Sequence, residues 1–384
     1  MRLQLTKLVA LVALAGASGT ARADGTLEAR GVYYKERSTR VMQPMLDGMF
    51  EVGARGLVNA HFLVDAITSA SSGSGAANAA AFTERRYEAG GTYTHELDGP
   101  AALPFVDKLR VGGEGKYSTE SDYTSLYVGA RLEADVAQKN AVIGLGGGVS
   151  TDNVTNAGAQ SPMGGPQIQC DVTSPATSGE CALTSYSAFA SVSQIVSKNA
   201  ILAVSYDIAK LDGYQANPYR TVITASGLVP EEHPNSRLRQ SIAFSARYYL
   251  GATGTTLIGA YRYYHDDWHI RAHTPELRII QEVGKLADAE IRGRYYRQTA
   301  SYFYADRYPA LDMNTINYVT DDPKLSAYDG FTMEAKLGVF GEEFGLSGNW
   351  AGARFEGILE YILQHNRFGD AVVAHVALTL PFSY

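Results

Sequence analysis

Apolar and polar side chains alternate along most of the chain with a period of two residues. In the stretch 126–136 one parity is apolar while the other is polar or charged; the apolar positions are Leu126, Val128, Ala130, Leu132, Ala134 and Val136. Successive side chains of a β-strand point to opposite faces, so this pattern predicts a strand with one apolar face. A tilted strand needs roughly 9–11 residues to cross a bilayer, and the repeating segments reach that length.

Sixteen segments of this kind follow one another, which predicts an all-β fold. Their ranges are 26–36, 41–52, 57–69, 83–97, 108–118, 123–136, 140–151, 183–197, 200–212, 237–250, 255–266, 273–284, 288–301, 328–340, 352–364 and 371–382. An even number of strands brings the two ends of the chain to the same side, as in bacterial single-chain barrels.

The breaks between these segments alternate in length. The short breaks are 53–56, 138–140, 198–199 and 251–254, and the long breaks are 70–82, 152–182, 213–236 and 302–327. Outer-membrane barrels have short periplasmic turns and longer outer loops. We therefore predict an antiparallel transmembrane β-barrel of about 16 strands with this polarity. Two connections on the periplasmic side, 98–107 and 341–351, are longer than the pattern requires.

The last segment of the chain is expected to close the barrel by pairing with 26–36. Its apolar parity runs from Val372 to Tyr384, whereas His375 belongs to the opposite, lumen-facing parity. Phe382 and Tyr384 are predicted to lie at the membrane interface as a signal for the barrel-assembly machinery, so their removal is expected to block assembly. Pro381 has no N–H to donate, which predicts that the pairing finishes by about residue 380.

Residues 1–23 have the three regions of a secretory signal peptide. Arg2 and Lys7 precede an apolar core at 8–15, and Ala21-Arg22-Ala23 fits a cleavage site of small residues. We expect this segment to be removed, which leaves 24–384 as a single barrel domain. No later stretch has 18 unbroken apolar residues, so the sequence predicts no transmembrane helix.

Composition and charge narrow the functional classes. The chain has 25 Tyr and 39 Gly. Its net charge of −7 argues against a nucleic-acid partner. Its two cysteines, Cys170 and Cys181, lie in one Gly/Ser/Pro-rich break. In an exported protein they predict a disulfide that closes a small loop, worth about 2–3 kcal/mol.

Charged residues of the polar parity are expected to face the lumen. A charge in the lipid band costs about 2–4 kcal/mol at mid-depth, which excludes the outer face. Opposed rows of arginine and carboxylate would filter solutes by charge and size, although a salt-bridge network that merely fills the interior remains an alternative. The lumen candidates are Arg110, Glu114, Arg131, Glu133, Arg247, Arg262, Glu290, Arg292, Arg294, Glu356 and Glu360.

One cluster has the residue types of a metal site, and we treat it as a weak candidate. His265, Asp267, His269 and His273 share one parity near the outer mouth, where imidazole and carboxylate could hold a divalent ion. A polar loop tip is the simpler interpretation, and no cofactor is expected. His61 and Asp65 share a lumen face and predict a buried hydrogen bond. The sequence has no G-x-S-x-G nucleophile elbow and predicts no catalytic residue.

Four short segments resemble a bacterial family of exported proteins, domain of unknown function 3570. They are Tyr33-Tyr34-x-Glu36, Val41-Met-Gln-Pro44, 65–71 and 302–308. The resemblance implies an uncharacterised bacterial outer-membrane β-barrel, and it implies no catalytic residues.

The sequence thus predicts a protein of the bacterial outer membrane, surrounded by lipid and inserted by the barrel-assembly machinery. The leading function is a porin-like channel that passes small polar solutes through a charged lumen. The alternative is a scaffold or sleeve that binds periplasmic or surface proteins. An outer-membrane lipid hydrolase fits least, because the nucleophile and its base are missing from the sequence pattern.

Overall fold

The computed structural model describes residues 24–37, 39–70, 81–121, 123–155, 180–217, 220–311 and 317–383. The predicted signal peptide, Cys170 and Tyr384 lie outside these residues. No helix in the described part of the chain has the length and apolarity needed to span a membrane.

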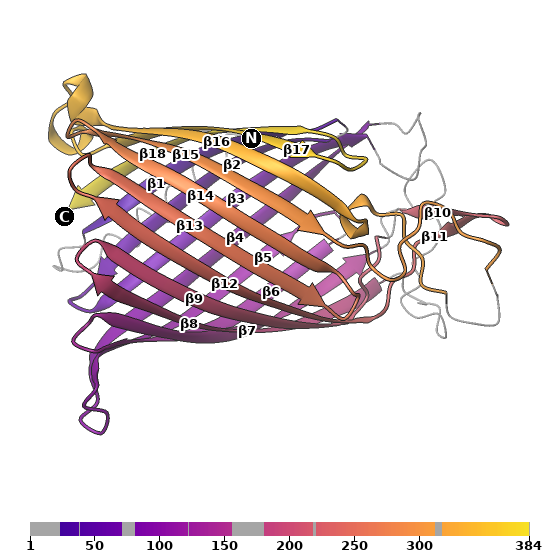
Figure 1. Cartoon of the computed structure of the whole chain (residues 1–384), viewed down its shortest axis with the longest axis horizontal. Coiled ribbons are helices and arrows are strands. Elements are labelled where there is room, and N and C mark those ends of the chain that lie inside the picture. Colours follow the sequence, from indigo (N-terminus) through magenta and orange to yellow (C-terminus); the bar gives the residue numbers. More distant parts are fainter. Residues whose placement is uncertain are drawn as a thin grey trace.

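Sixteen antiparallel strands form one closed barrel, in which every strand pairs with its neighbours in the chain and β1 pairs with β18 (Figure 1). The barrel strands are β1 (Asp24–Lys35), β2 (Thr39–Val52), β3 (Gly56–Ala70), β4 (Ala81–Asp98), β5 (Val106–Thr119), β6 (Tyr123–Val136), β7 (Ala141–Thr155), β8 (Glu180–Ser197), β9 (Ala200–Gly213), β12 (Ser236–Leu250), β13 (Thr255–Asp266), β14 (Arg271–Val283), β15 (Ala287–Gln298), β16 (Tyr328–Phe340), β17 (Arg354–Gln364) and β18 (Ala371–Ser383).

The predicted sixteen-stranded barrel is confirmed, and the strand ends differ from the expected ones by at most four residues. The short breaks all lie at one end of the barrel, which we call the turn end, at the left of Figure 1. The described residues of the long breaks lie at the other end, the loop end. The connection 341–351 is a true long connection at the turn end, with two 3-10 helices, η3 (Gly341–Phe344) and η4 (Gly348–Trp350).

The outer face of the barrel is an apolar belt, as the alternation predicts. Exposed fractions of 59% for Val128, 66% for Ile291, 59% for Leu359 and 68% for Val376 show that large apolar side chains point away from the barrel. Such a belt matches the outward surface of a barrel that lies in lipid, where only alternate residues meet the hydrocarbon.

The seam between β1 and β18 runs along the full length of both strands, from Asp24 opposite Ser383 to Lys35 opposite Val372. The expectation that the pairing stops by about residue 380 is therefore wrong. β17 pairs with β18 only as far as Thr379, so at Pro381 the strand has a partner strand on one side only, where a residue without an N–H is tolerated. Phe382 packs against Phe50 with ring centroids 5.7 Å apart.

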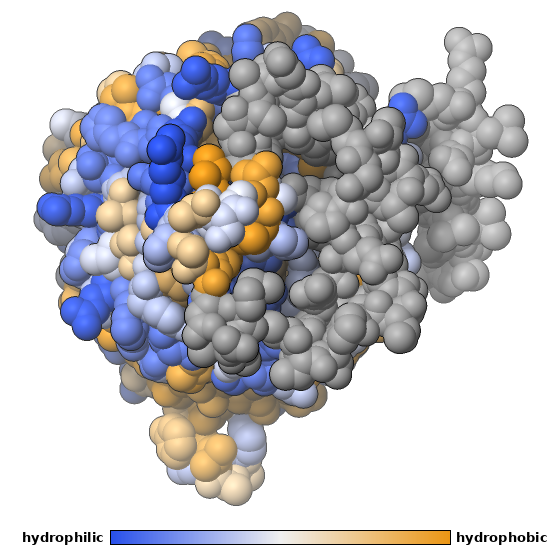
Figure 2. Space-filling view, turned by 90° about the vertical axis from the view of Figure 1, so that its right-hand side faces the viewer, coloured by the Kyte–Doolittle hydropathy of each residue, from blue (hydrophilic) through white to orange (hydrophobic). Residues whose placement is uncertain are grey.

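The loop end carries an additional structure that the alternation did not predict. A hairpin of β10 (Thr221–Thr224) and β11 (Gly227–Pro230) lies inside the break 213–236. Isolated bridges join this segment to the 302–327 segment: Thr224 pairs with Tyr308, and Glu232 with Val319. We call the described residues of 214–235 and 301–326, together with the β13–β14 loop 267–270, the cap. Figure 2 looks onto this end and shows hydrophobic groups near the middle of a mostly hydrophilic described surface.

Candidate functional site

All eleven lumen candidates lie on the face opposite the apolar belt. The clearest marker is Arg292 of β15, whose Nη2 contacts the carboxylates of Glu334 on β16 and Glu360 on β17. A side chain can reach past the neighbouring strand in this way on the concave side of a curved sheet. In the register of β15, β16 and β17, each of these three residues lies opposite another residue of the same inner face.

The wall formed by β14–β17 is a dense network of ion pairs. Glu276 accepts from Arg278 and Arg294 at 2.8 and 2.7 Å. Arg354 contacts Asp288 at 2.6 Å and Glu356 at 3.0 Å, and Lys336 Nζ lies 2.7 Å from Glu356. Glu276, Arg278 and Asp288 were missed as candidates, although the same parity argument places them on the lumen face of their strands.

A second network covers β4–β6. Arg110 donates to Glu133 at 3.0 Å and to both carboxylate oxygens of Asp135, at 3.0 and 2.6 Å. Tyr127 donates to Glu114 at 2.9 Å. In these two walls the lumen charges mostly neutralise one another, which agrees with the interpretation of an ion-pair network and leaves few charges free to act on a solute.

Three predicted residues differ from this rule, because no carboxylate in the described part of the chain lies within 4.0 Å of them. Arg131 donates to Thr94 Oγ1 at 3.2 Å, and Arg262 donates to Ser241 Oγ at 3.1 Å. Arg247 is exposed on the lumen face of β12. The predicted set therefore divides into paired residues and residues whose charge is available.

Two cavities occupy the middle of the barrel. The first has a volume of about 700 Å³ and lies against β1–β7, where Glu28, Asp47, Glu114 and Lys116 line it. The second has a volume of about 690 Å³ and lies mainly against β8, β9 and β12–β15; Arg262, Arg294, Glu276 and several serines line it. Each volume is in the range of pockets that hold small molecules.

The cap packs onto lumen-facing side chains at the loop end. Gln298 Nε2 of β15 donates to the backbone oxygens of Lys324 and Ser326, at 2.9 and 2.6 Å. Arg237 of β12 binds Asp266 and lies over the ring of Trp268, 4.1 Å from its centroid. Since Gln298 and Arg237 belong to the lumen parity, the described residues of the cap fold over the inner side of the mouth above β12–β15.

The cap has its own dry core. Trp268, Ile270, Phe303 and Leu325 are all at most 7% exposed and pack together. His233 joins them, with its ring 5.3 Å from those of both Trp268 and Phe303. These aromatic side chains come from three segments far apart in the sequence, so the cap is a tertiary structure and not a set of separate loops.

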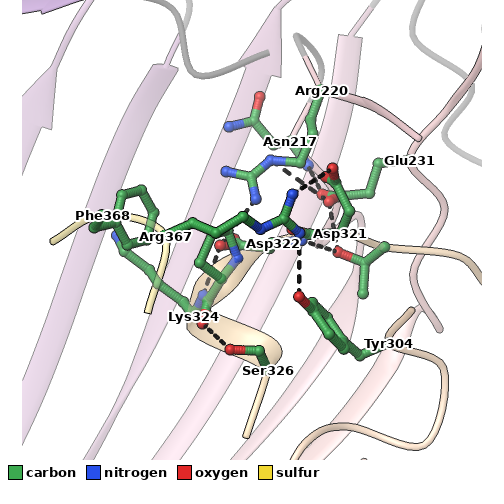
Figure 3. A network of polar contacts seen from close by, with 12 residues as sticks. Asn217, Arg220, Glu231, Tyr304, Asp321, Asp322, Lys324, Ser326, Arg367 and Phe368 are labelled. Carbon is green, nitrogen blue, oxygen red and sulfur yellow. Dashed lines mark hydrogen bonds and ion pairs between the residues drawn. The ribbon is translucent and has the colours of Figure 1, made fainter. Parts of the chain in front are cut away.

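Buried ion pairs connect the 214–235 part of the cap to its 301–326 part (Figure 3). Glu231, whose side chain is fully buried, accepts from Thr320 Oγ1 at 2.6 Å and from the Asn217 backbone at 3.0 Å, and it lies 3.1 Å from His233 Nε2. Burial raises the pKa of the Glu231 carboxyl, but His233 and the charge of Arg220 outweigh it, so this pKa lies below its usual range. Burial raises the pKa of Asp321.

A third connection extends the cap across the mouth to the loop between β17 and β18. Arg367 donates to the Asp321 backbone oxygen at 2.9 Å, to Asp306 at 3.0 Å and to Tyr304 Oη at 3.1 Å. Figure 3 shows its guanidinium between Tyr304 and Asp321. The cap is thus anchored on both β12–β15 and β17–β18.

The structure does not assemble the weak metal candidate. His265 and His273 flank Tyr263, with ring centroids 5.9 and 5.2 Å from it, and His269 contacts Tyr302 instead. Among the described residues no three His, Cys, Asp or Glu side chains form a group that could hold a metal ion.

Two smaller predictions have different outcomes. The predicted contact between His61 and Asp65 is wrong: His61 Nδ1 lies 2.5 Å from Asp47, the residue opposite it on β2, and Asp65 pairs with Arg86 at 2.9 Å. Cys181 is 2% exposed and disulfide-bonded. Because Cys170 lies outside the described residues, its pairing with Cys181 stays a prediction.

Solved structures resemble this chain in fold. A bacterial polysaccharide outer membrane secretin has a TM-score of 0.50 at 8% identity, with 93% of this chain and 98% of that chain covered. The outer membrane protein OprD from Pseudomonas aeruginosa has a TM-score of 0.45 at 10% identity, covering 94% of each chain. A BenF-like porin from Pseudomonas fluorescens Pf-5 has a TM-score of 0.43 at 10% identity, covering 94% and 98%. At such identities the likeness concerns the fold alone.

No curated protein matches the sequence. One family model does, and it spans residues 7–361, which is most of the chain. The resemblance expected from the short motifs is therefore confirmed: the chain belongs to the family described as "Protein of unknown function (DUF3570)".

Proposed function

We propose that this protein is a porin-like channel of the bacterial outer membrane that passes small polar solutes. The observation that carries the proposal is a closed barrel with an apolar outside and an ionic, hollow inside: sixteen strands enclose cavities of about 700 and 690 Å³ lined by charged and hydroxylated side chains. A sixteen-stranded barrel is wide enough to leave an aqueous passage.

The apolar belt supports the location. Most charged side chains of the lumen parity form ion pairs inside, while many outward positions carry Leu, Val and Ile with large exposed fractions. A barrel of this kind is stable in lipid because every backbone donor and acceptor is paired within the closed sheet. The expected surroundings are therefore outer-membrane lipid, and insertion would use the barrel-assembly machinery.

The presence of the cap favours a selective channel and argues against a wide-open pore. It lies over the inner side of the mouth above β12–β15, so solutes would enter beside it, above the strands that it leaves uncovered. Charge pairs that are half exposed in the lumen would then act on solutes, because fields in a narrow passage are less screened than in bulk water. We propose no catalytic step and no cofactor.

Conductance of the purified, folded barrel in planar bilayers tests this function. We expect discrete, salt-dependent steps, and we expect the preference for cations to rise when Arg292 and Arg294 are both replaced by Ala, since two positive lumen charges are lost. The matched control is Arg85→Ala together with Arg297→Ala, which removes two arginines of the outward parity and should leave selectivity unchanged. A folded barrel that gives no steps would contradict the proposal and would favour the sleeve for partner proteins.

A further inference from the structure

The arginines without carboxylate partners are concentrated on one wall of the lumen. Eight of the lumen-facing arginines in the described strands form ion pairs: Arg30, Arg86, Arg110, Arg237, Arg278, Arg292, Arg294 and Arg354. Within the same described strands Arg131, Arg239, Arg247 and Arg262 have none. Three of these four belong to the adjacent strands β12 and β13.

These three residues form a row along the direction of β12 and β13. Arg262 lies opposite Ala243 of β12, and Arg239 and Arg247 lie four residues to either side of that position. At about 3.3 Å per residue the steps are roughly 13 Å along the strand. Arg239 lies near the loop end, where its Nε is buried without a hydrogen-bond partner. An anion that moves along this wall would meet a free guanidinium at the mouth, in the middle and near the turn end.

The middle arginine, Arg262, stands beside the second cavity, which is also lined by five serine and threonine hydroxyls. Ser191, Ser193, Ser205, Ser245 and Thr274 line this volume of about 690 Å³. No hydrogen bond to another described residue occupies these five hydroxyls, so they can donate to and accept from a solute. Gly144 makes room for one of them, because a Cβ at this position would lie 2.6 Å from Ser191 Oγ.

Charges around the cavity orient a solute within it. On the β5–β6 side the described lining of the cavity contributes Arg110 and Glu133, and Arg110 is already paired with Glu133 and Asp135. On the β13–β15 side Arg278 and Arg294 share Glu276, and Arg262 adds an unpaired cation. Arg262 is linked to the carboxylate of Asp207 through Ser241 Oγ, which accepts from Arg262 and donates to Asp207 at 3.3 Å. Among the described lining residues an anionic group would therefore meet an unpaired cation at Arg262 and only a paired one on β5–β6.

We propose that this cavity binds a small polyhydroxylated monoanion, with its acidic group on the Arg262 guanidinium and its hydroxyls on the serines of β8, β9 and β12. The guanidinium presents a planar fork that fits a carboxylate or phosphate in a bidentate manner. Arg239 and Arg247 mark its route in and out. The inference names the solute class for the proposed channel and rests on that function for its physiological meaning, but binding itself can be measured without conduction.

Equilibrium dialysis of gluconate against the folded barrel in detergent tests the site directly. We expect Arg262→Gln to weaken gluconate binding about tenfold or more, since a bidentate charged contact is lost. Arg131→Gln is the matched control: it removes another lumen arginine without a carboxylate partner, on β6 away from the row, and should change binding by less than about twofold. Heat-modifiable migration on gels verifies that each variant is folded.

A second pair of measurements tests the hydroxyls and the orienting charge. The double variant Ser191→Ala and Ser205→Ala should weaken gluconate about three- to tenfold and leave acetate, which has no hydroxyl, unchanged. Asp207→Asn should strengthen gluconate binding, because the one linked carboxylate is neutralised. If Arg262→Gln does not fold, these variants still test whether gluconate binds at the proposed site.

The site is overturned if gluconate binds the Arg262→Gln barrel as it binds the wild type, or if Arg131→Gln weakens binding equally, because lumen charge alone would then explain the affinity. Acetate that binds as tightly as gluconate would overturn the role of the hydroxyls. Gluconate binding to a barrel that gives no conductance steps would support the binding site and contradict the channel function. Conductance steps without gluconate binding would support the channel function and contradict the binding site.

Discussion

The cap and the lumen walls use the same side chains in two different environments. In the cap, Glu231 has a fully buried carboxylate and Arg220 is 9% exposed in its side chain, and His233 connects Glu231 to the aromatic core. In the lumen, Arg294 is 39% exposed and Lys116 is 48% exposed, beside cavities. Breaking a buried pair leaves an uncompensated charge and is strongly destabilising, whereas a pair that water can reach contributes little to stability.

This difference separates residues that hold the structure from residues that can act on a solute. The cap pairs should determine whether the mouth keeps its shape, and the lumen pairs should determine which ions pass. Replacing a cap residue should therefore change stability first, and replacing a lumen residue should change permeation first. Trp268 allows this to be tested, because the chain has only two tryptophans and the other, Trp350, is exposed at the turn end.

The largest effect is expected for Phe303→Ala. Its ring is 5% exposed and lies 5.0 Å from that of Trp268, so truncation should destabilise the cap by about 3–5 kcal/mol through the cavity left behind. In a Trp350→Phe background the Trp268 emission should shift to longer wavelength and the cap should open at lower urea. Phe344→Ala, at an exposed turn-end position, is the control. Unchanged emission in the Phe303 variant would mean that the cap core contributes little.

A smaller effect is expected for Glu231→Gln. The amide keeps the shape but removes the charge that faces Arg220 and His233, so we expect a loss of about 2–3 kcal/mol in cap stability. Urea titration followed by Trp268 emission measures it, and the heat-modifiable migration of the barrel should not change. Arg367→Gln reports on the exposed connection of the cap and should lose less, because Arg367 is 49% exposed.

Acid should remove the difference between wild type and Glu231→Gln. The pKa of Glu231 is lowered in the folded cap, so the stability it contributes is present above the unfolded value of about 4.3 and is lost as the pH falls through the lowered pKa. Asp321, whose pKa is raised by burial and in part by the charge of Glu231, acts in the opposite direction, and this contribution should be smaller in the Gln variant. Urea midpoints that stay apart well below the lowered pKa would show that the charge of Glu231 is not the cause.

The smallest stability effect is expected in the lumen. Arg294→Gln leaves Glu276 with its second partner Arg278 at 2.8 Å, so the barrel should lose only about 0.2–1 kcal/mol. Its permeability ratio for anions over cations should nevertheless fall, as measured by the reversal potential under a KCl gradient. A large loss of stability with unchanged selectivity would reverse the comparison between the cap and the lumen.

The strands and their faces could be predicted from the sequence, because the period of two is a local signal and the lipid excludes charge from one parity. The pairing of lumen charges could not be predicted so well. Arg292 on β15 contacts Glu360 on β17, beyond the neighbouring strand β16. His61 lies opposite Asp47 in the register of β2 and β3, and the alternation of the sequence does not determine that register. The cap was missed for a related reason: Arg237, Trp268 and Phe303 meet through tertiary packing, and no period in the sequence links them.

The seam between β1 and β18 sets the order in which the barrel can be built. Asp24 pairs with Ser383, so the ring closes through contacts between residues almost a whole chain apart, and such contacts form slowly because the chain must first lose the entropy of a very long loop. Until then both strands are open edges that other strands can join. Closure is therefore expected to be the last and slowest step of folding, and an unclosed sheet is the species that the cell must keep from aggregating.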